Sequence, residues 1–324
     1  MLAVDGSRIA LPRNPDTEAT FGIHTIRTQH IVEPEYQCFG RASVLYDVLN
    51  RVALDAVLTR GDSSEVALAI EHMDHVRLND LVLYDRGYAG YRLLAEASQH
   101  PGDFLVRCGS NSFATARKML AGGGKSDVIK QVRPSDKVKR ELREVGSSLP
   151  TKLTVRFVRI TLKTGEYEVL ATSLLDQARY PLDIFEELYW QRWGVETFYG
   201  VLKTRLGLEN FSGHSAEAIL QDFHATVFLT GMESMLTQDA NEQLAGLAGK
   251  HPRKVNKAVS FNAIKTRAFD LLLSDRSQDE VLKELTELFL TNPVSSRPDR
   301  NPPRGRATHT RSLRFWKNMK KIVF

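Results

Sequence analysis

Cysteine and long apolar runs are scarce in this sequence. Only Cys38 and Cys108 occur among 324 residues, too few for a disulfide framework or a cysteine-based zinc site. A reducing cytosol is therefore the expected location. No run of about 18 apolar residues is present, so no membrane span is expected. The N-terminus also lacks the basic-then-apolar pattern of a secretory signal. With 42% hydrophobic and 26% charged residues, the composition is typical of a globular chain.

Positive charge is distributed unevenly. The formal net charge is only +5, yet residues 297–321 contain nine Lys or Arg and one acid, Asp299. Three prolines favour an extended backbone in the first part of this segment. A basic end of this kind is either a solubilising tail or a contact for a phosphate backbone, and both interpretations remain open.

The order of local patterns predicts a mixed α/β sheet with helices on its faces. A strand should begin at the first residue and end at Asp5, and a hairpin should join residues 42–48 to 52–59. A helix should follow from Ser63 or Ser64 to His75. The remaining expected elements of this half are a strand at 80–84 ending at Asp85, a helix at 91–98 and a strand at 104–108.

Together with the second half of the sequence, these patterns divide the whole chain into four regions. We expect a first part of an α/β domain at 1–109, a β-containing insertion at 110–165, a second part at 166–236, and a helical C-terminal region with the basic tail at 237–324. The second part should contain one helix from about 182 to 206 and another at 216–236. The glycines at 122–124 precede a lysine, but they lack the frame of a phosphate-binding loop.

His72 and His75 have a spacing that can hold a metal ion. Since no third ligand lies nearby in the sequence, we expect both histidines to be surface residues.

One segment carries four polar residues on a single helix face. Their spacings of +3, +4 and +7 place them within a wedge of about 60° at about 100° per residue; they are Tyr189, Arg192, Glu196 and Lys203. An apolar stripe runs beside them, so this polar face should look out along the edge of a core. The same pattern also fits a solvated helix whose Arg192 and Glu196 form an ordinary i,i+4 pair.

Three acids are candidate metal ligands. Asp5 and Asp85 each precede a glycine near an expected strand end, and Glu196 lies on the polar helix. Taken singly, the aspartates could be turn residues. Together, three carboxylates need a compensating charge, and oxygen ligands favour Mg²⁺ or Mn²⁺. Two such ions would activate a water or a 3′-hydroxyl and stabilise a leaving oxygen.

These residues resemble the DDE transposases of the insertion-sequence-4 family. The family's Tyr-x2-Arg-x3-Glu-x6-Lys signature is matched without a gap, and its two aspartate blocks resemble Asp5-Gly6-Ser7 and Asp85-Arg86-Gly87-Tyr88. The resemblance spans about residues 1–236. It implies a ribonuclease-H-like fold interrupted by a β insertion and followed by a helical C-terminal region. It also implies that the three acids bind the catalytic metals.

For the remaining signature residues the resemblance implies contacts with DNA. Tyr189, Arg192 and Lys203 would contact the transposon end, with Arg192 gripping a phosphate and Lys203 acting as a point charge. Trp193 could stack on a base or pack within the protein, and Arg86 could pair with Asp85 or reach a phosphate. The expected partners are transposon ends and target DNA, bound by a homodimer, in the cytoplasm of a bacterium.

Family members usually carry a helical DNA-binding region before the first aspartate, whereas four residues precede Asp5 here. The sequence therefore leaves three hypotheses. The first is a transposase core, N-terminally truncated, that cuts DNA and transfers strands. The second is a ribonuclease-H-like nuclease without strand transfer. The third is a DNA-binding remnant without activity.

Overall fold

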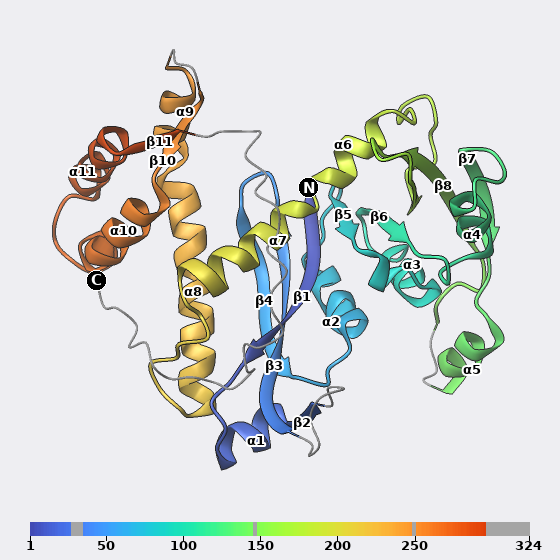
Figure 1. Cartoon of the computed structure of the whole chain (residues 1–324), viewed down its shortest axis with the longest axis horizontal. Coiled ribbons are helices and arrows are strands. Elements are labelled where there is room, and N and C mark those ends of the chain that lie inside the picture. Colours follow the sequence, from blue (N-terminus) through green and yellow to red (C-terminus); the bar gives the residue numbers. More distant parts are fainter. Residues whose placement is uncertain (27–34, 145–147, 248–250, 296–324) are drawn as a thin grey trace. The chain divides into compact units, whose positions relative to one another are not determined.

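A mixed β-sheet organises residues 2–172 of the computed structural model, which describes residues 1–26, 35–144, 148–247 and 251–295 (Figure 1). In chain order its strands are β1 (Leu2–Ala10), β2 (Ile23–Ile26), β3 (Glu35–Asp47), β4 (Val52–Arg60), β5 (Leu81–Tyr84), β6 (Asp103–Cys108), β7 (Asp127–Val132), β8 (Leu153–Thr161) and β9 (Tyr167–Thr172). Their spatial order is β2-β3-β1-β5-β6-β9-β8-β7, with β4 also paired to β3. Strands β1, β5 and β6 are parallel, whereas β9 pairs antiparallel with β6 and β4 pairs antiparallel with β3, which confirms the predicted mixed sheet.

The chain separates into two compact units, one formed by Met1–Ile9 with Glu18–Val201 and one by Ala10–Thr17 with Leu202–Phe324. Helices of the first half are α1 (Pro15–Phe21), α2 (Glu65–Glu71), η1 (His72–His75), η2 (Arg86–Tyr88), α3 (Tyr91–Ala97), α4 (Ala114–Leu120) and α5 (Asp136–Glu144). Those of the second half are α6 (Ile184–Trp190), α7 (Trp193–Gly200), η3 (Val201–Arg205), α8 (Ala216–Leu236), α9 (Gln238–Ala245), α10 (Lys257–Leu272) and α11 (Gln278–Thr291), with a ribbon of β10 (Arg253–Val255) and β11 (Pro293–Ser295).

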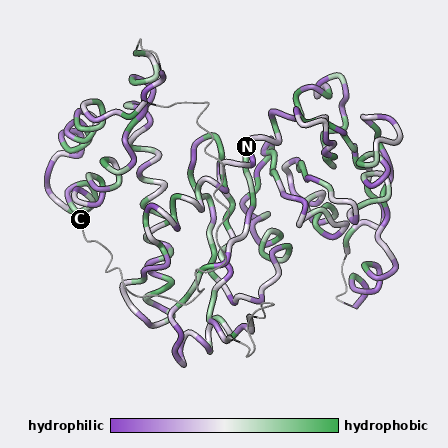
Figure 2. The backbone as a smooth tube through the Cα atoms, in the orientation of Figure 1, coloured by the Kyte–Doolittle hydropathy of each residue, from purple (hydrophilic) through white to green (hydrophobic). Residues whose placement is uncertain are grey.

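The helices α9 to α11, with α8 before them, confirm the expected helical C-terminal region. They pack around their own apolar core, which includes Ile264, Leu285 and Phe289. In Figure 2, hydrophobic segments lie along the helices and strands of both units. None of the helices among the described residues is long and apolar enough to cross a membrane. The basic segment 297–321 lies outside the described residues.

Alternate residues of the central strands point to opposite faces of the sheet. Even-numbered residues, among them Val4, Tyr84 and Val106, belong to one large core together with apolar side chains of α2, α3 and α4. The odd-numbered residues of β1, β5 and β6 therefore face the other side. On β3 the alternation is offset by one, since Leu45 belongs to this core, so Tyr46 faces the other side and contacts Phe198 of α7 with ring centroids 4.8 Å apart. Because Asp5 is odd-numbered, it lies on the face toward α7.

Several local predictions are confirmed. Strands β3 and β4 form the predicted hairpin, and Arg51 in its turn has a positive φ of 59°. Ser64 caps α2 by accepting from the backbone N–H of Ala67. The prediction that the first strand ends at Asp5 is wrong, because β1 continues to Ala10. Only the part of β1 up to Val4 pairs with β5, so Asp5 lies where this ladder stops.

The predicted insertion at 110–165 contributes α4, β7, α5 and β8. Strand β8 pairs with β9 and β7 pairs with β8, so these strands extend the sheet. The boundaries at 109, 165 and 236 remain predictions.

The single helix predicted from 182 to 206 is divided. Helix α6 ends at Trp190, α7 begins at Trp193, and the last turn is a π-helix, η3. Between α6 and α7 the backbone bonds shorten to i→i−3, from Arg192 N to Tyr189 O at 3.1 Å and from Gly194 N to Gln191 O at 3.0 Å. At this point α7 lies close to the residue that follows β3, since a Cβ at Gly194 would lie 3.3 Å from Val48 Cγ1.

The surface prediction is wrong for His72 and correct for His75. The His72 side chain is 1% exposed, whereas that of His75 is 52% exposed. His72 Nδ1 lies 2.6 Å from Asp55 Oδ2, and Nε2 lies 2.9 Å from Ser43 Oγ. Burial lowers the pKa of His72, so the neutral ring joins α2 and its continuation to β3 and β4.

A buried arginine ties the far end of the sheet to the segment before α6. Arg156 is fully buried, and its Nε and Nη2 donate to the two oxygens of Asp127 at 2.9 and 2.7 Å. Its Nη1 donates to the carbonyls of Leu174 and Tyr180 at 3.1 and 2.8 Å. The guanidinium also lies 5.0 Å from the ring centroid of Phe185 on α6. Arg156 therefore helps to fix where α6 begins.

Arg156→Met should strongly destabilise the chain, because it leaves a carboxylate and two carbonyls without their donor. We expect a loss of about 3–5 kcal/mol in the free energy of unfolding, measured by chemical denaturation. Lys139→Met is the matched control, since it removes only an exposed pair with Asp136 and should change little. Equal effects of the two substitutions would contradict this role.

Candidate active site

Three polar residues form one row across the parallel strands. In the sheet register Val4 lies opposite Tyr84, and Tyr84 lies opposite Val106. The next residues along each strand are Asp5, Asp85 and Arg107, so they continue the register at neighbouring positions about 4.8 Å apart. The backbone of Asp85 is still extended, with φ −76° and ψ 171°. The row therefore brings two carboxylates and a guanidinium to one face of the sheet.

Asp5 is a partly buried carboxylate. Its Oδ1 accepts from the backbone N–H of Gly6 at 2.9 Å, and its backbone carbonyl accepts from the Tyr199 hydroxyl of α7 at 3.0 Å. Burial raises the pKa of Asp5 to about 6, and the charges of Glu196 and Asp85 act in the same direction. The mutual effect of these charges shows that the three predicted acids share one neighbourhood.

Asp85 accepts more side-chain hydrogen bonds than the other two acids do. Arg107 donates to its Oδ1 from Nη2 at 2.7 Å and from Nε at 3.0 Å, and the Tyr189 hydroxyl donates to the same oxygen at 3.4 Å. Burial raises the pKa of Asp85, but the backbone N–H of Arg86 and the charge of Arg107 outweigh it, so the pKa is lowered overall. Asp85 is therefore a stable carboxylate at neutral pH.

Glu196 is paired with Arg192 one turn before it. The Arg192 Nη2 donates to Glu196 Oε1, and the guanidinium lies 5.2 Å from the Trp193 ring centroid and 5.9 Å from that of Tyr189. The expectation that this polar face looks outward is wrong for Tyr189 and Arg192, which are 4% and 2% exposed, whereas the Glu196 side chain is 38% exposed. Both buried residues lie beside the division between α6 and α7, where Tyr189 contacts Asp85 and Arg192 contacts Glu196.

The other predicted contact residues are placed differently. Trp193 and its neighbour Trp190 are 37% and 67% exposed, with ring centroids 6.2 Å apart. Arg86 is exposed and contributes its backbone N–H to Asp85. Lys203 belongs to the second compact unit, where its Nζ lies 3.9 Å from Glu209 Oε1 and burial lowers its pKa.

The three carboxylates suit Mg²⁺ or Mn²⁺ in their chemistry, since both are hard ions that prefer oxygen ligands. Within the described ranges, no group of three His, Cys, Asp or Glu side chains is close enough to hold a metal ion. Two of the three acids are held in ion pairs, Asp85 with Arg107 and Glu196 with Arg192. The ligand types fit a metal centre, although these two side chains are bonded to arginines.

Sequence reasoning missed Arg107 and its second partner, Glu168. Arg107 Nη1 donates to Glu168 Oε1 at 2.8 Å. The available signal was a charged residue at a core-like position of the apolar run Phe104-Leu-Val-Arg-Cys108. Its importance depends on the register of β5 with β6, which the sequence pattern does not specify.

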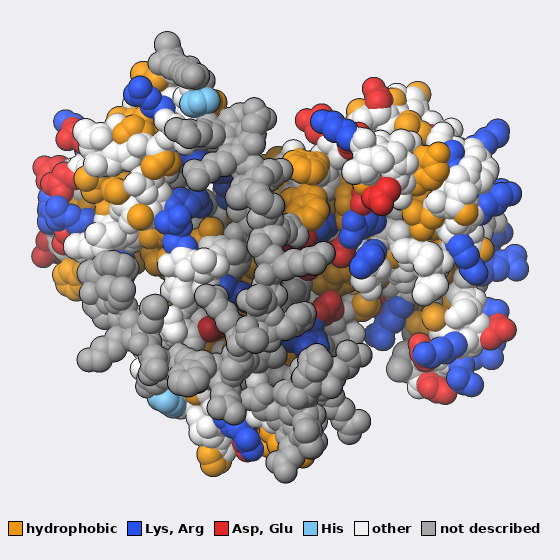
Figure 3. Space-filling model, in the orientation of Figure 1, with side chains coloured by type: hydrophobic (Ala, Val, Ile, Leu, Met, Phe, Trp, Pro, Cys, Tyr) orange, Lys and Arg blue, Asp and Glu red, His pale blue; other side chains and the backbone are white. Residues whose placement is uncertain are grey.

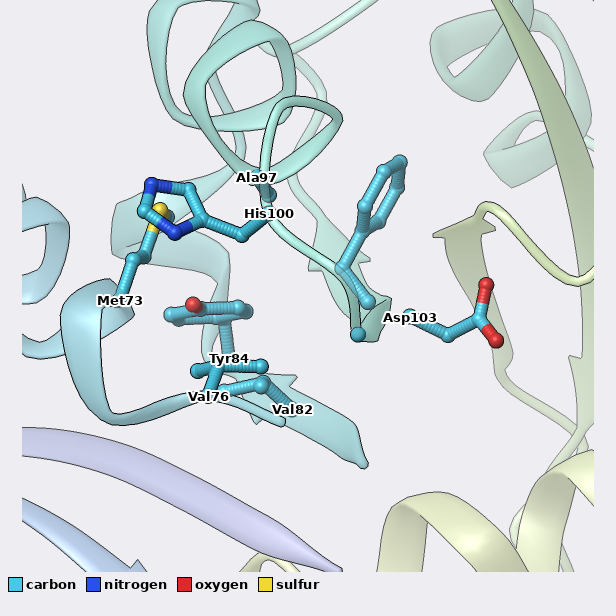
Figure 4. Close-up of a pocket in the computed structure, with 9 residues that line it drawn as sticks. Met73, Val76, Val82, Tyr84, Ala97, His100 and Asp103 are labelled. Atoms are coloured by element: carbon cyan, nitrogen blue, oxygen red, sulfur yellow. The ribbon is translucent and has the colours of Figure 1, made fainter. Parts of the chain in front are cut away.

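A small hollow in the core is separate from this row. Figure 4 shows it beside Tyr84, with Met73, Val82 and His100 around it. Tyr84 belongs to the even-numbered set of the central strands, so the hollow is on the face opposite Asp5. Its mainly apolar lining indicates a packing defect.

Comparison with known proteins identifies a family to which this chain is similar. A family described as "Transposase DDE domain" matches residues 1–230. The transposase InsG for insertion sequence element IS4 of Escherichia coli (strain K12) is 25% identical over 206 residues, which cover 63% of this chain and 44% of that protein. The match thus spans less than half of that relative's length. A structure of the piggyBac transposase synaptic complex with hairpin DNA aligns with a TM-score of 0.48 and 9% identity, over 89% of this chain and 57% of the other.

Asp5→Asn should stabilise the metal-free chain at neutral pH. The pKa of Asp5 is about 6 in the fold against 3.8 as its ordinary value, so its favourable contribution is complete below pH 3.8 and is lost as the pH rises through 6. At pH 7 the substitution should raise the free energy of unfolding by about 1–2 kcal/mol, after allowance for partial solvent screening. Chemical denaturation at pH 7 and pH 4 tests this.

Near pH 4 the difference between Asp5→Asn and the unsubstituted chain should largely disappear. Asp74→Asn, at an exposed position, is the control and should show no such pH dependence. A gain in stability that is equal at both pH values would contradict the assignment.

Proposed function

The chain belongs to the family of proteins with a transposase DDE domain, and we propose that it cleaves DNA at the ends of an insertion sequence and joins the freed 3′ ends to a target. The observation that supports this most is the row of Asp5 and Asp85 on the sheet face toward α7, the helix that carries Glu196. Two acids fixed by strand register and one by a helix are the ligand types that metal-dependent phosphoryl transfer requires.

In this proposal Asp5, Asp85 and Glu196 hold Mg²⁺ or Mn²⁺, as two ions. The bound ions would activate a water or a 3′-hydroxyl and stabilise the leaving oxygen. The protein fixes the carboxylates: Gly6 and Tyr199 hold Asp5, and Arg107 with Tyr189 holds Asp85. Arg192 orients Glu196 by pairing with it.

DNA is the proposed partner, through the signature helices. Trp190 and Trp193 offer exposed rings on which a base can stack, beside the buried Tyr189. Arg192 is bonded to a carboxylate, and a phosphate oxygen is an equivalent acceptor for its guanidinium. Lys203 and Arg86 would contact the phosphate backbone as positive charges.

A second surface of the first unit suits the same polyanion. Figure 3 shows lysines and arginines gathered over the part that contains α4, β7 and α5. The exposed cations of this region are Arg117, Lys118, Lys125, Lys130, Arg133, Lys137, Arg140 and Arg143. They would bind duplex DNA in a salt-dependent manner.

Transposition joins two DNA ends, so we propose a homodimer on DNA, acting in the cytoplasm at the nucleoid. A nuclease without strand transfer and a binding-only remnant are the alternatives. They differ from a transposase in the products they would form. A nuclease gives cut ends without joined products, and a remnant gives a complex without either.

Glu196→Gln should abolish product formation. The assay uses this chain, Mg²⁺ or Mn²⁺, and duplexes that carry the terminal repeats flanking its gene, with cut and joined strands resolved on gels. We expect metal-dependent products from the unsubstituted chain and a loss of at least 10²-fold in the variant, as for removal of one electrostatic contact from a transition state. Glu187→Gln, on the exposed side of α6, is the matched control and should retain activity.

The catalytic proposal fails if the chain binds DNA and gives no metal-dependent product, or if Glu196→Gln is fully active. Cut ends without joined strands under the same conditions would favour the nuclease.

A further inference from the structure

Asp85 is bonded unevenly by its neighbours. Both Arg107 contacts and the Tyr189 contact meet Oδ1. Among the described residues, no side-chain donor lies on Oδ2. A carboxylate held by one oxygen presents the other in a fixed direction, which is how supporting hydrogen bonds orient metal ligands.

Arg107 is itself held by a second acid. Its Nη1 donates to Glu168 Oε1 at 2.8 Å, while Nη2 and Nε are on Asp85. In the register of β6 and β9, Arg107 lies opposite Leu170, so Glu168 is its diagonal neighbour on the same face. The side chains of Arg107 and Glu168 are 24% and 19% exposed, so their contact is only partly screened by water.

We propose that Arg107 and Glu168 are a positioning pair that orients Asp85 for a divalent cation. The inference rests on the proposed function, and it goes beyond it by assigning a role to two residues outside the three acids. Glu168 acts through Arg107, and Arg107 acts through Asp85. Neither side chain is a ligand of the metal.

An ordinary cross-strand ion pair would show the same contact between Arg107 and Glu168. A positioning pair differs from such an ion pair in one respect: its loss weakens cation binding in a chain that remains folded. The geometry also requires an acceptor on Glu168 more than a charge, because the bond from Nη1 fixes the plane of the guanidinium. Glu168→Gln keeps an acceptor at Oε1, whereas Glu168→Leu removes it.

The test is titration of the full chain with Mn²⁺ by isothermal calorimetry. Glu168→Leu and Arg107→Leu should each weaken Mn²⁺ binding by about 10-fold or more, in the range found for partners that support a metal ligand. Glu168→Gln should stay within about threefold of the unsubstituted chain. Arg159→Leu is the matched control, since Arg159 lies on β8 with the Met119 and Gly123 carbonyls as partners.

Circular dichroism and thermal melts identify any variant that fails to fold, and Glu168→Gln against Glu168→Leu then carries the comparison. Native Mn²⁺ affinity in folded Glu168→Leu and Arg107→Leu overturns the positioning role and leaves the proposed function intact. Equal weakening in Glu168→Gln and Glu168→Leu overturns the need for an acceptor and thus the proposed geometry. Asp85→Asn should not bind Mn²⁺. If the unsubstituted chain does not bind Mn²⁺ either, the metal site itself is overturned.

Discussion

The parallel register of β1, β5 and β6 is the constraint on which the site depends. It stops pairing at Val4 and Tyr84 and sets Asp5, Asp85 and Arg107 in one row, although 80 and 22 residues separate them along the chain. A shift of one residue in either ladder would turn a member of the row toward the apolar core. The apolar residues on the opposite face, such as Val4 and Tyr84, therefore fix the position of the acids as firmly as any polar contact does.

Charge balance explains why each acid differs in its surroundings. Asp85 is paired with Arg107 and Glu196 with Arg192, while Asp5 has a backbone N–H as its hydrogen-bond donor. Arg192 lowers the pKa of Asp5 from a distance, yet burial and the two neighbouring acids prevail. Two arginines against three acids leave the site one positive charge short, before Glu168 is counted. A cation would restore this balance, which is the electrostatic reason for expecting a metal ion.

The sequence predicted the elements of the fold better than their geometry. The β3–β4 hairpin, the Ser64 cap and the bounds of α8 follow from local turn, capping and periodicity rules, because neighbouring residues decide them. The predicted end of the first strand was wrong, since β1 continues past its pairing with β5 through the polar residues Asp5, Ser7 and Arg8 to Ala10. His72 was misassigned because its partners, Ser43 and Asp55, are 29 and 17 residues away in the sequence.

The signature residues of the site also show that local sequence rules do not predict contacts between distant parts of the chain. A uniform helix would have carried Tyr189, Arg192 and Glu196 on one outward face. The chain instead tightens between α6 and α7, where Gly194 also lies close to Val48, and Tyr189 and Arg192 are buried. The bulky Trp190 and Trp193 are then left outside. One sequence motif thus supplies two kinds of side chain. Some are buried donors that hold carboxylates, and others are exposed rings beside them. A helical wheel assumes constant geometry, so it cannot separate these two roles. They depend on the division between α6 and α7 and on contacts distant in the sequence, such as that of Tyr189 with Asp85.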